Sequence, residues 1–196
     1  FILFARNIET PRQVRKLTAA LRDLVGREDA PILIDQEGGR VQRLAGPHWR
    51  TYPPGRAYGE LDPVVAREIC RLGARLMAND LSALGINVDC LPVLDVPAPD
   101  GHAVIGDRAY GATPETVAVL GRAAAEGLIA GGVLPVIKHI PGHGRALQAG
   151  LPGLLDPDRL PDARYALVPH VPGAPAEGLF AAGTEGAVRV PDAHAD

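Results

Sequence analysis

Short apolar runs alternate along the chain with longer amphipathic segments. The apolar runs cover residues 1–4, 31–34, 88–96 and 133–137, and each has the length of a buried strand. Segments of helical length lie between them, and this alternation is the pattern of βα units around a parallel sheet. The pattern predicts an α/β domain whose strands are joined by helices.

Each of the three helix-length segments begins with a capping residue followed by a proline. The pairs are Thr10-Pro11, Asp62-Pro63 and Thr113-Pro114; the first side chain accepts from a free N–H, and proline suits the first helical position. Gly131-Gly132 is expected to end the third helix. The apolar residues expected to share a face are Val14, Leu17, Leu21 and Leu24 in the first helix, Ile69, Leu72 and Leu76 in the second, and Val117, Leu120, Ala124 and Leu128 in the third.

Polar residues gather where the apolar runs end. The run ends carry Arg6-Asn7, Asp35-Gln36-Glu37, Asp95 and Lys138-His139. In a parallel barrel the carboxyl ends of all strands share one rim, so these side chains would converge on one pocket. A doubly wound open sheet also binds ligands at the carboxyl ends of its strands, so the pattern leaves both architectures open.

Two segments combine arginines with acidic residues. In residues 35–43 an acid at a strand end, Asp35, precedes paired glycines that let the backbone approach a ligand closely, and Arg43 follows. Arg108 is a fork-shaped donor suited to hydroxyl or carbonyl oxygens. The alternative for both segments is a solvated loop that holds an ion pair, with Arg108 paired to Asp107.

Residues 138–144, with the sequence Lys-His-Ile-Pro-Gly-His-Gly, form another candidate site. Lys138 and His139 lie on opposite sides of a strand end, and the turn after them is open to close approach. His139 and His143 have no third ligand nearby, so no metal site is predicted. Lys138 also suits the Schiff-base nucleophile of an aldolase-type barrel, and nothing in the segment decides between these roles.

Composition favours a small-molecule partner. The 196 residues are 46% hydrophobic, enough for one core, but a complete eight-stranded α/β barrel typically has roughly 250 residues. The net charge is −3 and no run of Lys or Arg occurs, so neither nucleic acid nor a membrane surface is expected as a partner. No apolar stretch approaches the roughly 20 residues of a transmembrane helix.

Cysteine usage and the first residue add little more. Cys70 and Cys90 show no C-x-x-C spacing, which favours buried, reduced thiols over a disulfide or a zinc site. The chain begins with Phe1 inside an apolar run, so we expect it to start within the fold, and the absence of a leader is uninformative.

Five segments in order resemble glycoside hydrolase family 3, and within it the bacterial β-N-acetylhexosaminidases of peptidoglycan recycling. These segments cover residues 3–8, 35–43, 91–96, 105–108 and 138–144. The resemblance implies that residues 1–148 form a partial TIM-type (β/α)₈ barrel with about strands 2 to 5. It also implies a cytoplasmic enzyme without a cofactor that hydrolyses terminal β-linked N-acetylglucosamine with retention, from muropeptides or short amino-sugar oligosaccharides.

The resemblance further implies which residues bind the sugar. Asp35, Arg43, Arg108, Lys138 and His139 would hydrogen-bond the terminal N-acetylglucosamine, and Gly142, His143 and Gly144 would form a loop beside the site. The carboxylate would accept from sugar hydroxyls, and the cationic groups would orient the remaining oxygens. Such contacts can strengthen as the ring flattens towards an oxocarbenium-like transition state.

The family's catalytic groups have no counterpart in this chain. The subfamily manages the proton with the histidine of an Asp-Ser-His motif shortly after Gly-His-Gly, and an aspartate on a late strand is the nucleophile. Here the chain reads Ala149-Gly150-Leu151-Pro152. One extra G converts the codons GCC-GAC-TCC-CAC, for Ala-Asp-Ser-His, into GCC-GGA-CTC-CCA, for Ala-Gly-Leu-Pro.

We therefore hypothesise a frameshift near residue 150, which resequencing of the coding DNA would test. Residues 149–196 would then be out-of-frame translation, and they are expected to be largely irregular because proline interrupts helices and central strands. The prolines lie at 152, 157, 161, 169, 172, 175 and 191. We expect the chain itself to be inactive as a glycosidase, and the alternative is a remnant without catalytic function.

Overall fold

The structure, a computed structural model, describes residues 1–99, 101, 103–140, 142–144, 180–182 and 187–189. The chain divides into two compact units, Phe1–Ala149 and Gly150–Asp196. In the second unit the described residues are two short strands, β7 (Phe180–Ala182) and β8 (Ala187–Arg189), which pair antiparallel. The expectation of an irregular segment over 149–196 otherwise lies outside the described residues.

A four-stranded parallel sheet forms the centre of the first unit. Its strands are β1 (Ile2–Leu3), β2 (Leu33–Ile34), β5 (Val88–Asp89) and β6 (Leu134–Pro135), and they lie side by side in chain order. A doubly wound sheet reverses its strand order, whereas right-handed crossovers between strands in chain order place all the helices on one face. The fold is thus a partial α/β barrel, as predicted.

The first predicted strand pairs only at its middle, and the third is shorter than the apolar run. β5 ends at Asp89, and pairing resumes only at a parallel bridge between Val93 and Lys138. Pro92 lies between these points and has no N–H to donate to a sheet ladder. The bridge holds the segment that leads to Asp95 beside the segment that carries Lys138 and His139.

The three predicted helices begin where the capping signals place them. They are α1 (Pro11–Val25), α3 (Pro63–Ser82) and α4 (Pro114–Ala130), and the side chains of Thr10, Asp62 and Thr113 accept from backbone N–H groups of the first turns. Gly131 is the C-cap of α4, and the next residue, Gly132, has a φ of 77°, which favours glycine.

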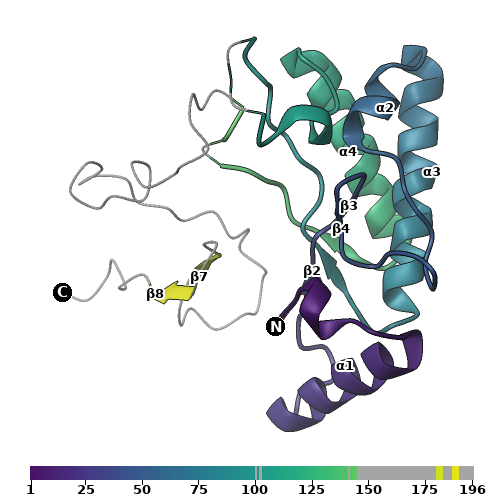
Figure 1. Ribbon diagram of the computed structural model, residues 1–196, viewed down its shortest axis with the longest axis vertical. Coiled ribbons are helices and arrows are strands. Elements are labelled where there is room, and N and C mark those ends of the chain that lie inside the picture. The colour runs from purple at the N-terminus through teal and green to yellow at the C-terminus, as the bar shows by residue number, and fades with distance from the viewer. Residues whose placement is uncertain (100, 102, 141, 145–179, 183–186, 190–196) are drawn as a thin grey trace. The chain divides into compact units, whose positions relative to one another are not determined.

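The core lies between the helices and the sheet, and α3 and α4 run side by side (Figure 1). The face predicted for α4 is buried as expected. The face predicted for α3 is wrong: Ile69, Leu72 and Leu76 are more than 40% exposed, and Leu24 of α1 is 79% exposed. The buried residues of α3 are Ala66, Cys70, Ala74, Met77, Ala78 and Leu81.

Small residues take the positions of α3 that α4 approaches most closely. A Cβ atom added to Gly127 of α4 would lie 2.2 Å from the carbonyl oxygen of Arg71. Large side chains at this contact would separate the helices, so the contact is made by small residues such as Ala74 and Ala78. Cys70 is buried as predicted and Cys90 is half-buried; both are free thiols.

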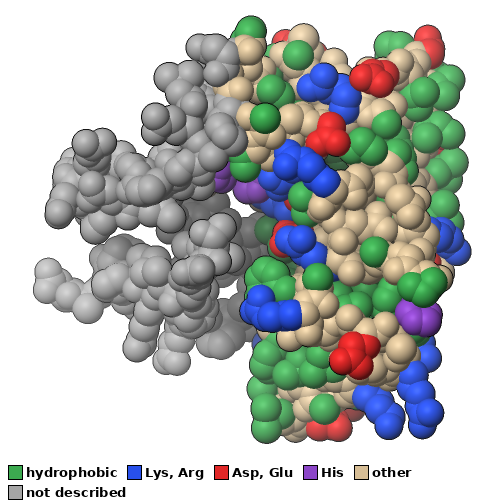
Figure 2. Space-filling view, viewed as in Figure 1, with side chains coloured by type: hydrophobic (Ala, Val, Ile, Leu, Met, Phe, Trp, Pro, Cys, Tyr) green, Lys and Arg blue, Asp and Glu red, His purple; other side chains and the backbone are tan. Residues whose placement is uncertain are grey.

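Shorter elements complete the described part of the first unit. They are η1 (Ala5–Asn7), β3 (Gln36–Gly38), β4 (Val41–Gln42), α2 (Gly55–Gly59) and η2 (Gly106–Arg108). β3 and β4 form an antiparallel hairpin that the apolar pattern did not predict. Among the described residues no helix is long and apolar enough to cross a membrane. Figure 2 shows acidic and basic side chains interspersed over the face in view.

We expect Leu81→Ala to lower the free energy of unfolding by about 2–5 kcal/mol, because truncation of a fully buried leucine leaves a cavity. Leu81 of α3 has no exposed surface. The matched control is Leu24→Ala, which removes the same atoms from an exposed helical position and should cost less than about 0.5 kcal/mol. Urea unfolding followed by circular dichroism measures both, and equal losses would contradict the described core.

Candidate substrate-binding site

The structure brings together all five residues for which sugar binding is expected. Lys138 Nζ lies 2.7 Å from Asp35 Oδ1, and Arg43 Nη2 lies 3.2 Å from Asp35 Oδ2. Arg108 Nη2 lies 3.4 Å from His139 Nε2. These side chains come from η2 and from the segments that follow β2, β4 and β6, so these segments converge as predicted. Arg6 and Asn7, which follow β1 and were expected at the same place, instead contact Phe4.

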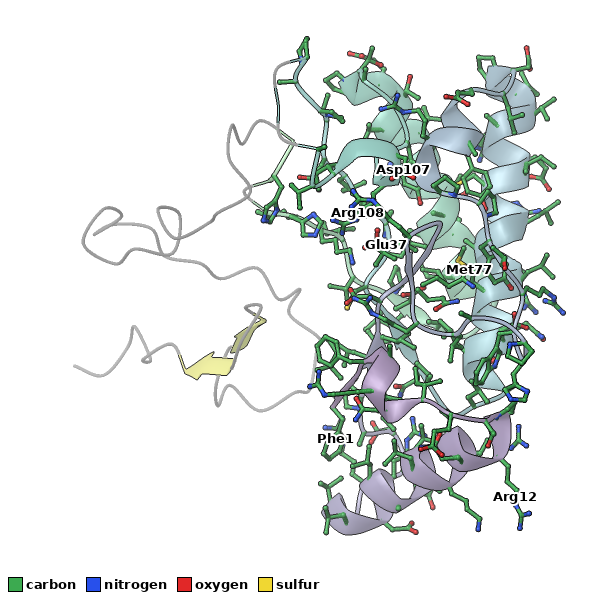
Figure 3. The ribbon with its side chains drawn as sticks, viewed as in Figure 1. Phe1, Arg12, Glu37, Met77, Asp107 and Arg108 are labelled. Carbon is green, nitrogen blue, oxygen red and sulfur yellow. The ribbon has the colours of Figure 1, made fainter. Side chains whose placement is uncertain are left out.

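Glu37 joins the two halves of this cluster. Its carboxylate accepts hydrogen bonds from Nε and Nη2 of Arg108, each at 2.8 Å, and also pairs with Lys138 Nζ. Only 4% of the Glu37 side chain is exposed, and Figure 3 shows Glu37 and Arg108 pointing toward one another. A bidentate arginine–carboxylate pair is the strongest geometry for such a contact. The ion-pair cluster, defined as Asp35, Glu37, Arg43, Arg108 and Lys138, is therefore continuous.

The β3–β4 hairpin, which carries Glu37, is hydrogen-bonded to the loop that leads through η2 to Arg108. Arg40 Nη2 donates to the carbonyl oxygens of Ala103, Val104 and Ile105, and Arg40 Nε contacts Asp107. Arg108 therefore lies at the end of a loop that Arg40 of the hairpin holds by hydrogen bonds and an ion pair. The predicted alternative, in which Asp107 is the partner of Arg108, is wrong, because Arg108 is paired with Glu37.

The paired glycines allow a close approach to the loop that follows the hairpin. Gly38 and Gly39 have φ values of 91° and 56°. A Cβ atom added to Gly38 would lie 2.3 Å from the carbonyl oxygen of Pro53. Gly39 N–H donates to the carbonyl oxygen of Tyr52. Glycine is required here because the hairpin packs directly on the following loop.

Asp95 anchors the other end of the site. Its side chain is fully buried, and Oδ2 lies 2.6 Å from Nδ1 of His139. Oδ1 accepts from the backbone N–H groups of His143 and Gly144. Burial raises the pKa of Asp95, but the hydrogen bond from the His139 ring and those from the loop backbone lower it more, so the pKa lies below its ordinary value and the group is ionised.

The neighbouring charges favour the ionised forms of Asp35 and Lys138. Burial raises the pKa of Asp35, but Lys138 and Arg43 lower it further, to below its ordinary value. Burial lowers the pKa of Lys138, but Glu37 and Asp35 more than reverse this and leave it above its ordinary value. A Schiff-base lysine needs a depressed pKa to supply a free amine. Lys138, paired with two carboxylates, therefore does not fit the aldolase alternative.

Asp95, His139 and His143 also form the described group whose potential metal-ligand atoms lie within 4.8 Å of one another. Both oxygens of Asp95 already accept from N–H groups, and one of these bonds involves His139 Nδ1. A cation would have to displace these hydrogen bonds, so the geometry fits a hydrogen-bonded anchor better than a metal site.

Glu37 and Asp95 were expected at the rim formed by the strand ends, but they were not among the five residues expected to bind the sugar. Glu37 lies two positions after Asp35, and alternate residues of an extended segment point to the same side, so this spacing was the available signal. Asp95 was placed at a strand end by the sequence, but its partner, His139, is 44 positions away.

A groove of about 350 Å³, lined by Tyr52, Tyr58, Ile69, Leu72 and neighbouring residues, shares no residue with the ion-pair cluster.

Polar side chains at the strand ends of a partial α/β barrel define a class of barrel proteins that bind ligands at this rim. The family described as "Glycosyl hydrolase family 3 N terminal domain" matches residues 1–154. The chain belongs to glycoside hydrolase family 3.

Known relatives agree with this family. A β-hexosaminidase from Nitrosomonas eutropha is 43% identical over 153 residues, which are 76% of this chain and 42% of that protein. NagZ from Neisseria gonorrhoeae in complex with N-trifluoroacetyl-D-glucosamine superposes with a TM-score of 0.68 at 36% identity, over 73% of this chain and 42% of that one. A family 3 β-N-acetylglucosaminidase from Paenibacillus gives 0.66 at 39% identity, over 75% and 28%. The chain spans about two fifths of the length of the β-hexosaminidase that it matches.

We expect Glu37→Gln to lower the free energy of unfolding by about 3–5 kcal/mol, because it leaves two buried cations without their shared carboxylate. The matched control is Glu68→Gln, since Glu68 is a half-exposed partner of Arg71 on α3. That control should cost at most about 1 kcal/mol. Thermal and urea unfolding measure both variants, and an equal, small loss in each would show that the Glu37 pairs are not formed.

The lowered pKa of Asp35 predicts a pH dependence. The folded protein binds the Asp35 proton less tightly than the unfolded chain, so the contribution of this carboxylate is complete above about pH 4 and is lost as the pH falls through the lowered pKa. The excess stability of the wild type over Asp35→Asn should shrink as the pH is lowered from about 5 to 3 in urea titrations. A constant difference would contradict the ion pair.

Asp89 supplies a control of opposite sign. Complete burial raises its pKa well above the ordinary value, while Oδ1 accepts from Gln36 N–H. The folded protein therefore holds this proton more tightly than the unfolded chain, and the wild type should lose stability relative to Asp89→Asn as the pH rises above about 4.

Proposed function

We propose that this chain carries the sugar-binding half of a retaining β-N-acetylhexosaminidase, which hydrolyses terminal β-linked N-acetylglucosamine from muropeptides or short amino-sugar oligosaccharides in the cytoplasm. The observation that carries the proposal is the ion-pair cluster at the strand ends. The N-trifluoroacetyl-D-glucosamine held by the Neisseria relative supports an amino sugar as the ligand.

The cluster keeps hydrogen-bonding capacity that its own contacts do not use. An ionised carboxylate has about four acceptor positions, and in Asp35 the described partners are Lys138 and Arg43. Lys138 has three N–H donors and contacts two carboxylates. The unused positions suit the hydroxyls of a sugar, which donate and accept at the same oxygen.

The proposed roles follow from these positions. Asp35 accepts from ring hydroxyls, while Lys138 and Arg43 donate to sugar oxygens and keep Asp35 ionised. Arg108, fixed on Glu37, donates to oxygens at the other end of the ring beside His139. Hydrogen bonds between charged groups and sugar hydroxyls raise the rate where they strengthen in the transition state.

The bond-breaking groups are not assigned to this chain. The family pattern places Asp-Ser-His where the chain reads Ala149-Gly150-Leu151-Pro152, and those positions lie outside the described residues. Our second candidate is therefore a remnant that binds an amino sugar without hydrolysing it. An assay with an aryl N-acetylglucosaminide separates the two, because turnover by this polypeptide would refute the remnant.

We expect Asp35→Asn to weaken the binding of N-acetylglucosamine by roughly 10- to 100-fold, the loss that follows from removing a charged hydrogen-bond acceptor. The matched control is Asp29→Asn, since Asp29 pairs with Arg27 on the exposed surface. Isothermal titration calorimetry measures both, with folding verified by circular dichroism. Equal affinities of the two variants would remove Asp35 from the binding site.

A further inference from the structure

The carboxylate of Asp95 has no capacity left for a ligand. Oδ2 accepts from the backbone N–H of His139 at 3.2 Å and from its ring Nδ1 at 2.6 Å. Oδ1 accepts from the backbone N–H groups of His143 and Gly144. These four bonds fill the acceptor positions of an ionised carboxylate, and the side chain has no exposed surface. Any influence of Asp95 on a bound sugar must therefore pass through the groups that it holds.

The two neighbours of the His139 ring determine which nitrogen carries the hydrogen. A carboxylate only accepts, so Nδ1 must be the donor toward Asp95. Arginine only donates, so in the neutral ring the 3.4 Å contact with Arg108 Nη2 favours Nε2 as the unprotonated nitrogen. Both contacts select the Nδ1–H tautomer, with Nε2 as an acceptor on the side of the ion-pair cluster.

The same carboxylate holds the loop that packs on this ring. The His143 ring meets the His139 ring edge to face, with the centroids 4.6 Å apart. A Cβ atom added to Gly144 would lie 2.4 Å from the carbonyl oxygen of Val96, so the loop is pressed against the strand segment that carries Asp95. Asp95 thus fixes His139 through ring Nδ1. The ring of His143, in a loop that Asp95 also holds, packs against the His139 ring.

We propose that Asp95 is a positioning residue: it fixes the Nδ1–H tautomer and the ring orientation of His139, and so keeps Nε2 an acceptor, for which a sugar hydroxyl replaces Arg108 Nη2 as the donor. The last clause rests on the proposed function. The positioning of His139 does not, because it follows from contacts within the protein.

The test uses the full chain with ¹⁵N-labelled histidine and no ligand. Imidazole ¹⁵N shifts distinguish a protonated from an unprotonated ring nitrogen, and His139→Gln identifies the His139 signals among those of the six histidines. We expect the Nδ1–H tautomer in the wild type. A predominant Nε2–H tautomer there, or a ring protonated at both nitrogens, would overturn the proposal, whether or not any variant folds.

Two variants then separate Asp95 from the loop. Asp95→Asn replaces one accepting oxygen with an amide NH₂, so the Nε2–H tautomer of His139 should become populated. His143→Ala removes the ring contact and leaves the carboxylate in place, so the Nδ1–H tautomer should persist. A purely structural role of Asp95 predicts an unchanged tautomer in folded Asp95→Asn, which would also overturn the proposal.

Binding supplies the functional measurement. We expect Asp95→Asn to weaken the binding of N-acetylglucosamine by about tenfold, the loss of one well-placed hydrogen bond. Unchanged affinity in a variant whose tautomer has shifted would overturn the link between His139 and the sugar. If the wild type bound no amino sugar, the proposed function would fail, while the tautomer would still decide the role of Asp95.

Discussion

The ammonium group of Lys138, held between two carboxylates, is the interaction on which the site depends. It joins the end of β6 to Asp35 after β2 and to Glu37 in the hairpin. Removing charges from water costs several kcal/mol per ion, and only close opposite charges compensate for this. The strand order supplies that proximity, because parallel strands in chain order bring their carboxyl ends to one rim. The fold therefore makes the cluster possible, and the cluster in turn fixes the strand ends.

Two buried carboxylates, those of Glu37 and Asp95, hold different groups at this rim. Glu37 pairs with Arg108 and Lys138, and so it sets where positive charge lies at the rim. Asp95 holds N–H groups, and so it sets the direction of the His139 ring and of the loop at 142–144. Both carboxylates are almost completely buried. Asp35 and His139, which we propose contact the sugar, are partly exposed, and their buried partners keep their orientation.

Local signals in the sequence predicted the helix starts, because a capping side chain and a proline act within one turn, as at Thr10-Pro11. The convergence of Asp35, Arg108 and Lys138 was predicted from strand ends and family motifs, and the distances confirm that they meet. The buried face of α3 was not predicted, because it depends on how closely α4 approaches. Partners far apart in the chain, such as Asp95 and His139, could not be paired by spacing alone. The β3–β4 hairpin was missed because its strands are short and mostly polar.

A crystal structure of the protein soaked with N-acetylglucosamine tests the central claim most directly. The account predicts the pyranose ring at the strand ends, with hydroxyls on the Asp35 carboxylate and on Lys138 Nζ, and with Arg108 and His139 Nε2 facing the same ring. A sugar bound elsewhere, for example in the groove beside Tyr52 and Leu72, with the ion-pair cluster untouched, would contradict it.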